Sequence, residues 1–165
     1  MIDLSDSKYY INRELSLLQF NRRVLEQARN VETPLLERLK FLCISCSNLD
    51  EFYEVRVARL KEFEKHGLHG SGPDGMGPKE ALHQIELAAH DLVKLQYSVL
   101  NDELVPALSR EGINFIRRTH WTTRQQEWVR DYFKKEIFPV LSPVGLDPSH
   151  PFPPVINKSL NFIIS

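Results

Sequence analysis

The sequence predicts a mainly α-helical fold, with a long antiparallel helical hairpin, followed by the start of an α/β domain. Up to residue 111, apolar residues recur at every third or fourth position, as they do in amphipathic helices. A glycine-rich stretch over residues 67–77 divides the two longest of these patterns. After residue 112, short apolar runs flank one helical pattern, which is typical of a strand–helix–strand unit. We therefore expect a helical domain over residues 1–111 and an incomplete α/β domain over residues 112–165.

Length and composition limit the classes of protein that this chain can be. Its 165 residues, 42% of them hydrophobic, are enough to bury a real core. The net charge of −1 argues against a general nucleic-acid binder. No apolar run reaches the roughly 20 residues of a membrane span, and the polar N-terminus lacks the apolar core of a secretion signal. Two cysteines make no disulfide framework. We expect a cytoplasmic protein, with peripheral membrane association left open.

The first helix is predicted to follow a capping-box pattern, Ser16 with Gln19 three residues later. It is expected to run to about Asn30. The apolar residues at helical spacing in this stretch are Leu17, Phe20, Val24 and Ala28.

The second helix is predicted to begin at Thr33 and Pro34, a cap residue followed by proline at the first helical position. Glu37 then lies in the first turn, where the helix dipole favours a negative charge. The apolar pattern extends to about Lys65 and comprises Leu35, Leu39, Leu42, Leu49, Phe52, Val55 and Leu60.

The third helix is predicted to open at Pro78 and Glu80, after a flexible loop with glycines at 67, 70, 72, 75 and 77. Pro106 removes a helical hydrogen bond, so we expect a kink or restart near Asn101. Gly112 is the expected C-cap, and the second and third helices should form a long antiparallel hairpin. The residues at helical spacing are Leu82, Ile85, Ala89, Leu92, Gln96 and Val99.

The remaining residues predict three short strands, over 113–116, 140–144 and 160–164, and one helix. Thr122 and Gln125 form a second capping box, from which a helix should run to about Ile137. Six prolines between residues 139 and 154 keep the intervening chain extended or turning. The apolar last residues look like a strand stopped in mid-course, so we expect the N-terminal piece of a longer protein.

One face of the second helix carries residue types that suit a nucleotide. At 3.6 residues per turn, four residues share this face: Asn48, Phe52, Arg56 and Arg59. An amide can donate to and accept from a base or ribose edge, an aromatic ring can stack, and guanidinium groups bind phosphate. Simpler roles stay open for each. Asn48 could cap or kink the helix, Phe52 could pack in the core, and the arginines could pair with acids such as Glu54 and Glu62 on a solvated face.

Other polar residues on this helix predict no metal or redox chemistry. Asp50 and Glu51 are neighbours, whose side chains point about 100° apart in a helix, so they cannot easily share one ion. We expect them to pair with arginines. Cys43 and Cys46 are spaced as C-x-x-C, but no strand precedes them and a zinc site needs two more ligands. His66 and His69 follow at a spacing shorter than a zinc finger uses. Two small, buried helix cysteines are the favoured interpretation.

An ordered set of motifs resembles the polyphosphate kinase family. The opening stretch is YINRELS at residues 10–16, with FN at 20–21 and RVL at 23–25. The second stretch is PLLERLKFL at residues 34–42 with SNLDEF at 47–52. The third is DPSHPFP at residues 147–153 with NKSL at 157–160. The resemblance extends over nearly the whole chain, from residue 9 onward, and although no single motif is a catalytic signature, the ordered set is specific.

The resemblance implies an enzyme that reversibly transfers the terminal phosphate of ATP to polyphosphate. In that family the reaction passes through a phosphohistidine, with Mg²⁺, in the C-terminal half of a longer protein. This chain would then hold the helical domain and the start of the head domain, would lack the nucleophilic histidine and the Mg²⁺ ligands, and would be inactive alone. Asn48 occupies the place of a family asparagine that contacts ATP.

The resemblance also implies a homo-oligomer, in which this region contacts the enzyme's own C-terminal domains. An alternative function is therefore a helical dimerisation or interaction module without nucleotide contact. In that case an apolar stripe on more than one helix face would require a partner.

Overall fold

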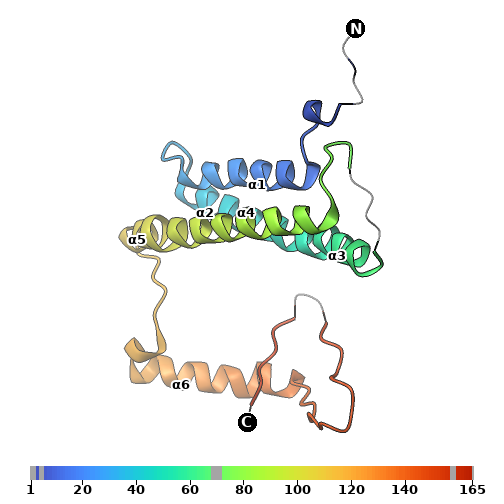
Figure 1. The fold of residues 1–165 in the computed structure, drawn as a ribbon. Coiled ribbons are helices and arrows are strands. Elements are labelled where there is room, and N and C mark those ends of the chain that lie inside the picture. The colour runs from blue at the N-terminus through green and yellow to red at the C-terminus, as the bar shows by residue number, and fades with distance from the viewer. Residues whose placement is uncertain (1–2, 4–5, 68–71, 157–158, 165) are drawn as a thin grey trace. The chain divides into compact units, whose positions relative to one another are not determined.

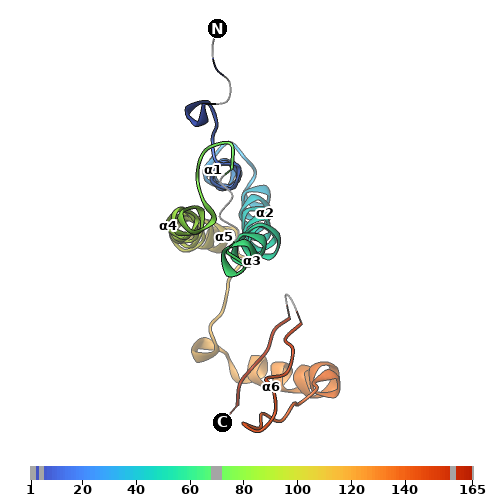
Figure 2. The ribbon, with the colours of Figure 1, turned by 45° about the vertical axis from the view of Figure 1, so that its right-hand side comes forward.

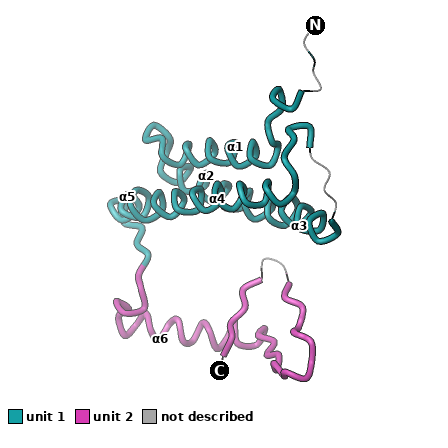
Figure 3. Tube along the Cα trace, in the orientation of Figure 1, with its two compact units in different colours: residues 1–115 teal, residues 116–165 magenta. Residues whose placement is uncertain are grey.

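The computed structural model describes residues 3, 6–67, 72–156 and 159–164, and it divides into two compact units. Unit 1 comprises residues 1–115 and unit 2 comprises residues 116–165 (Figure 3). The described residues form helices and no strand, so the prediction of a mainly α fold is confirmed. No helix among the described residues combines the length and the apolar character that crossing a membrane requires.

Unit 1 packs three helical segments side by side (Figures 1 and 2). The second and third run antiparallel, which confirms the predicted hairpin. The first segment is α1, Arg13–Arg29. The second is α2, Leu35–Phe52, continued by a π-helical turn, Tyr53–Val57, and by α3, Ala58–Lys65. The third is α4, Pro78–Ser98, continued by a π-helical turn, Val99–Leu104, and by α5, Val105–Arg110. A short 3₁₀ turn, Ser7–Tyr9, precedes α1.

The core of unit 1 lies where the three segments meet. On α4, every residue predicted to face the core is buried except Leu82, which is partly buried against it. On α1 the predicted face is off by one position over its first turns, because Leu17 and Phe20 are 40% and 49% exposed, whereas Ala28 is buried as predicted. The buried α1 residues are Glu14, Leu18, Asn21, Leu25 and Ala28. The polar Asn21 takes a core position because hydrogen bonds satisfy its amide.

The first residues of α1 and α2 differ from those that the local sequence signals predicted. Asn12, not Ser16, caps α1: its side-chain oxygen accepts hydrogen bonds from the backbone N–H groups of Glu14 and Leu15, each at 3.0 Å. The capping box expected at Ser16 is therefore wrong, because the helix begins earlier. Pro34 rather than Thr33 occupies the N-cap of α2.

Gly112 ends α5 as predicted, with a φ of 80° that glycine tolerates. The backbone N–H groups of Gly112 and Ile113 donate to the carbonyls of Ser109 and Leu108, which is a Schellman motif. Residues 68–71 of the predicted glycine loop lie outside the described residues, and they include His69.

A largely buried arginine joins the ends of the three segments. The Arg38 guanidinium donates to the Ala28 carbonyl at 2.7 Å and to the Glu103 carboxylate at 3.2 Å. Arg29 reaches the same carboxylate at 3.1 Å. These contacts tie the C-terminal end of α1 to α2 and to the π turn before α5.

Unit 2 contains α6, Thr123–Tyr132, continued by a π turn, Phe133–Ile137. Two 3₁₀ turns, Arg118–His120 and Phe138–Val140, flank this helix. The Thr122–Gln125 capping box forms as predicted. The strands predicted over 113–116, 140–144 and 160–164 do not form among the described residues. A strand requires a neighbouring strand to satisfy its backbone N–H and C=O groups, and no described segment pairs with these three.

Candidate functional site

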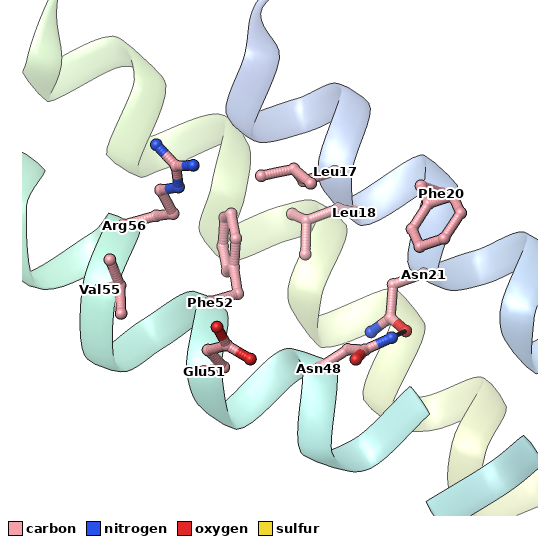
Figure 4. A pocket seen from close by; sticks show the side chains of 9 residues that line it. All are labelled: Leu17, Leu18, Phe20, Asn21, Asn48, Glu51, Phe52, Val55 and Arg56. Atoms are coloured by element: carbon pink, nitrogen blue, oxygen red, sulfur yellow. Dashed lines mark hydrogen bonds between the residues drawn. The ribbon is translucent and has the colours of Figure 1, made fainter. Parts of the chain in front are cut away.

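A pocket of about 260 Å³ opens between α1 and the second helical segment (Figure 4). Leu17, Leu18, Phe20 and Asn21 line it from α1. Asn48, Glu51 and Phe52 line it from α2, and Val55 and Arg56 from the π turn that follows. The structure thus brings together three of the four residues predicted to share one face. It adds a second wall that the helical spacing did not predict.

Asn48 is half-buried and belongs to a short chain of hydrogen bonds. Its Nδ2 donates to Asn21 Oδ1 at 3.3 Å. Asn21 is only 4% exposed, and its Nδ2 donates to the backbone carbonyl of Ser45 at 2.9 Å. The fully buried Ser45 hydroxyl accepts in turn from Gln96 Nε2 of α4, also at 2.9 Å. The pocket amide therefore rests on buried polar groups from all three segments.

The Phe52 ring lies between the hydrophobic core and the pocket. Its ring belongs to the hydrophobic core and is only 7% exposed, yet it also forms part of the pocket wall. It packs edge-to-face against Tyr53, with ring centroids 6.0 Å apart. The predicted core packing of Phe52 is confirmed, and stacking against a nucleotide stays a prediction.

Arg56 and Glu51 are the two charged groups of the pocket. Neither forms an ion pair with another residue in the described part of the chain, and Arg56 is half-buried. The π turn explains why Arg59 does not join them. Its wider i→i+5 turn shifts the following residues around the axis, so Arg59 does not line the pocket and its guanidinium lies 5.1 Å from the Phe63 ring centroid. π turns of this kind are frequent at functional sites.

The α1 wall is the part that sequence reasoning missed. Its one available signal was Asn21, a polar residue at the core position between Leu18 and Leu25. The Phe20 ring on the same wall has the Arg23 guanidinium 5.8 Å from its centroid. An amphipathic helix with an asparagine in its apolar stripe indicates a buried hydrogen-bonding partner on a neighbouring element.

The cysteines are exposed, which corrects the prediction that both are buried. Cys43 and Cys46 are free thiols on the outer side of α2, because the buried face of this helix is taken by Leu42, Ser45 and Leu49. Partial burial raises the pKa of the Cys46 thiol, and the neighbouring Cys43 and Asp50 raise it further. In the described residues no three His, Cys, Asp or Glu side chains gather in a possible metal site.

Fold and pocket together define a helical domain with a mixed polar and apolar pocket between two helices. Residues 10–116 match the family model for the polyphosphate kinase N-terminal domain, and residues 124–165 match that for the polyphosphate kinase middle domain. The chain belongs to the polyphosphate kinase family.

Proteins similar to this chain are named polyphosphate kinase. The chain is 55% identical over 98% of its length to a polyphosphate kinase of Pseudomonas syringae pv. tomato, of which it covers 22%. It is 53% identical over 92% of its length to that of Neisseria meningitidis serogroup B, of which it also covers 22%. A crystal structure of polyphosphate kinase from Porphyromonas gingivalis matches 94% of this chain and 21% of that chain, with 34% identity and a TM-score of 0.68. The chain thus spans less than a quarter of the length of these relatives.

Proposed function

We propose that this chain forms one wall of an ATP site in an enzyme that reversibly transfers the terminal phosphate of ATP to polyphosphate. The observation that carries the proposal is the convergence of Asn48, Phe52 and Arg56 on one pocket with Asn21. Because the names of the relatives belong to much longer proteins, the transfer reaction is a property of the complete enzyme that contains this chain.

The chemistry of the pocket suits a nucleotide. Asn48 supplies an amide for a base or ribose edge, the apolar side chains of both walls cover a flat ring, and the unpaired Arg56 guanidinium attracts phosphate oxygens. The Glu51 carboxylate at the same pocket repels phosphate groups and so restricts where they lie. Among the described residues that line the pocket there is no histidine, serine, threonine or cysteine, so we assign it binding and no covalent step.

We propose that the phosphohistidine and the Mg²⁺ ligands lie in parts of the enzyme outside this chain. Mg²⁺ prefers several oxygen ligands in an octahedron, and the pocket offers a single carboxylate, Glu51. The described residues therefore do not fit a protein-held Mg²⁺. On this proposal the isolated chain makes no polyphosphate, and synthesis by the isolated chain would contradict it.

The test is Asn48→Ala in the full-length enzyme. Loss of one neutral hydrogen bond of about 1 kcal/mol should raise the KM for ATP about fivefold, with kcat changed much less. The matched control is Asn101→Ala, an exposed asparagine in the Val99–Leu104 π turn, which should leave KM unchanged. Steady-state kinetics with varied ATP and saturating polyphosphate measure both values. An unchanged KM for Asn48→Ala would remove Asn48 from the site.

Exposed apolar side chains support a second role, self-association. Leu36 on α2 and Leu87 and Tyr97 on α4 are 61%, 52% and 61% exposed. Exposed apolar side chains that gather into one large patch mark an interface with another protein. Sedimentation velocity of the chain at increasing concentration tests this role, and a strict monomer at high concentration would argue against it.

A further inference from the structure

The buried hydrogen bonds beneath the pocket fix which atom Asn48 presents to a ligand. The argument begins at Ser45, whose backbone carbonyl can only accept a hydrogen bond. The Asn21 atom 2.9 Å from this carbonyl must therefore be the amide nitrogen, Nδ2. Asn21 is 4% exposed, so its side chain has little freedom to adopt another arrangement.

The orientation of Asn21 then determines that of Asn48. With its nitrogen directed at Ser45, Asn21 offers its oxygen on the other side, and an amide oxygen can only accept. The Asn48 atom 3.3 Å from Asn21 Oδ1 must be Nδ2. This leaves Asn48 Oδ1, which has no hydrogen-bond partner among the described residues, on a side chain that lines the pocket (Figure 4).

We propose that Asn21 is a positioning residue that holds Asn48 Oδ1 as a hydrogen-bond acceptor in the pocket. This inference rests on the proposed nucleotide function of the same pocket. The ligand group that it selects is a hydrogen-bond donor, an exocyclic amine of the base or a hydroxyl of the ribose. A free asparagine amide can rotate to present its NH₂ group instead, and it then discriminates poorly between donors and acceptors. With Asn21 in place, that rotation sets two oxygens against each other at hydrogen-bonding distance and is disfavoured.

The experiment compares ATP with analogues that lack one donor, in the full-length enzyme. Purine riboside triphosphate lacks the exocyclic amine, and 2′-deoxy-ATP and 3′-deoxy-ATP each lack one ribose hydroxyl. In the unmodified enzyme we expect one of the three to lose about fivefold in kcat/KM relative to ATP, as one hydrogen bond of about 1 kcal/mol predicts. The analogue that loses identifies the donor.

Asn21→Ala should reduce that loss to about twofold and raise the KM for ATP about threefold, with kcat within twofold. Asn48→Ala should abolish the loss, because the acceptor itself is gone. Asn21→Ser tests the same point with a smaller change, since its hydroxyl is too short to bridge Ser45 and Asn48, and it serves if Asn21→Ala does not fold.

The stability control is Arg38→Met, which removes buried hydrogen bonds at the other end of α1 and does not line the pocket. Arg38→Met should show the same loss of kcat/KM with the donor-lacking analogue as the unmodified enzyme, even if its melting temperature falls as far as that of Asn21→Ala.

Three results would overturn the inference: Asn21 variants that keep the full analogue loss, an Arg38→Met variant that loses it equally, or an unmodified enzyme that accepts all three analogues as well as ATP. If instead Asn48→Ala has a normal KM for ATP, Asn48 does not belong to the ATP site that the proposed function describes, so the two failures are distinguishable.

Discussion

Different interactions stabilise the interior of each compact unit. Every buried apolar side chain of the described residues lies in unit 1, between Leu18 and Leu108. In unit 2, no described residue is buried, and large side chains such as Trp128 and Phe138 are each 64% exposed. Unit 2 is instead shaped by local hydrogen bonds, among them the Thr122 capping box and the turn at Asp147. Unit 1 thus has a core whose loss is cooperative, whereas unit 2 consists of local motifs with independent effects.

The largest expected effect of this difference is at Leu25, whose side chain is completely buried. Leu25→Ala should lower the free energy of unfolding by about 2–5 kcal/mol, because it removes buried methyl groups and leaves a cavity. Trp128→Ala, in unit 2, should change it by less than about 0.5 kcal/mol. Urea unfolding of the chain followed by far-UV circular dichroism measures both. Similar losses for the two variants would show that the units share one cooperative core.

Helix capping gives a smaller effect. Asn12→Ala should lower the free energy of unfolding of unit 1 by about 1 kcal/mol, since it removes the acceptor for two backbone N–H groups. Thr122→Ala should reduce the helicity of α6 and leave the unfolding midpoint of unit 1 unchanged. Ser16→Ala is the control, because Ser16 is exposed within α1 and caps nothing. A shift in midpoint from Thr122→Ala would contradict the independence of unit 2.

The smallest effect concerns the turn at Asp147. Hydrogen bonds from the Ser149 side chain and backbone, and then from His150, lower the pKa of the Asp147 carboxyl. Because the folded pKa is lowered, the turn is stabilised above the unfolded pKa and loses this stabilisation as the pH falls through the folded pKa. A carboxyl ¹³C titration should place Asp147 below its ordinary value of 3.8, and Ser149→Ala should raise it. An ordinary pKa for Asp147 would show that the turn does not persist in solution.

The same contrast explains what could be predicted from the sequence. The buried face of α4 and of the start of the next turn was predicted because the residues at helical spacing from Ile85 to Val99 are apolar apart from Gln96. The buried face of α1 was not, because Asn21 occupies a core position through a bond to a carbonyl 24 residues away. The pattern within one helix can indicate that such a partner exists, but it does not identify the partner. The strands of unit 2 failed for a related reason, since a strand depends on a neighbour and not only on its own residues.

For the candidate site, helical spacing was sufficient for one wall and insufficient for the other. Asn48, Phe52 and Arg56 lie within one helical segment, so their shared face followed from the period of 3.6. The π turn has no recognised residue pattern, so the position of Arg59 could not be predicted. The α1 wall depends on how two helices pack, which the sequence of either helix alone does not determine.

The π turn at Tyr53–Val57 also has an evolutionary consequence. A π turn contains one residue more than the α turn that could replace it, so it can absorb a deletion of one residue by tightening. After such a deletion, α3 would keep its orientation and its packing against α4. A deletion before Val57 would exchange or displace the two residues of the turn that line the pocket, Val55 and Arg56. Val57, which is buried in the core, would have to keep its place for the packing of unit 1 to persist.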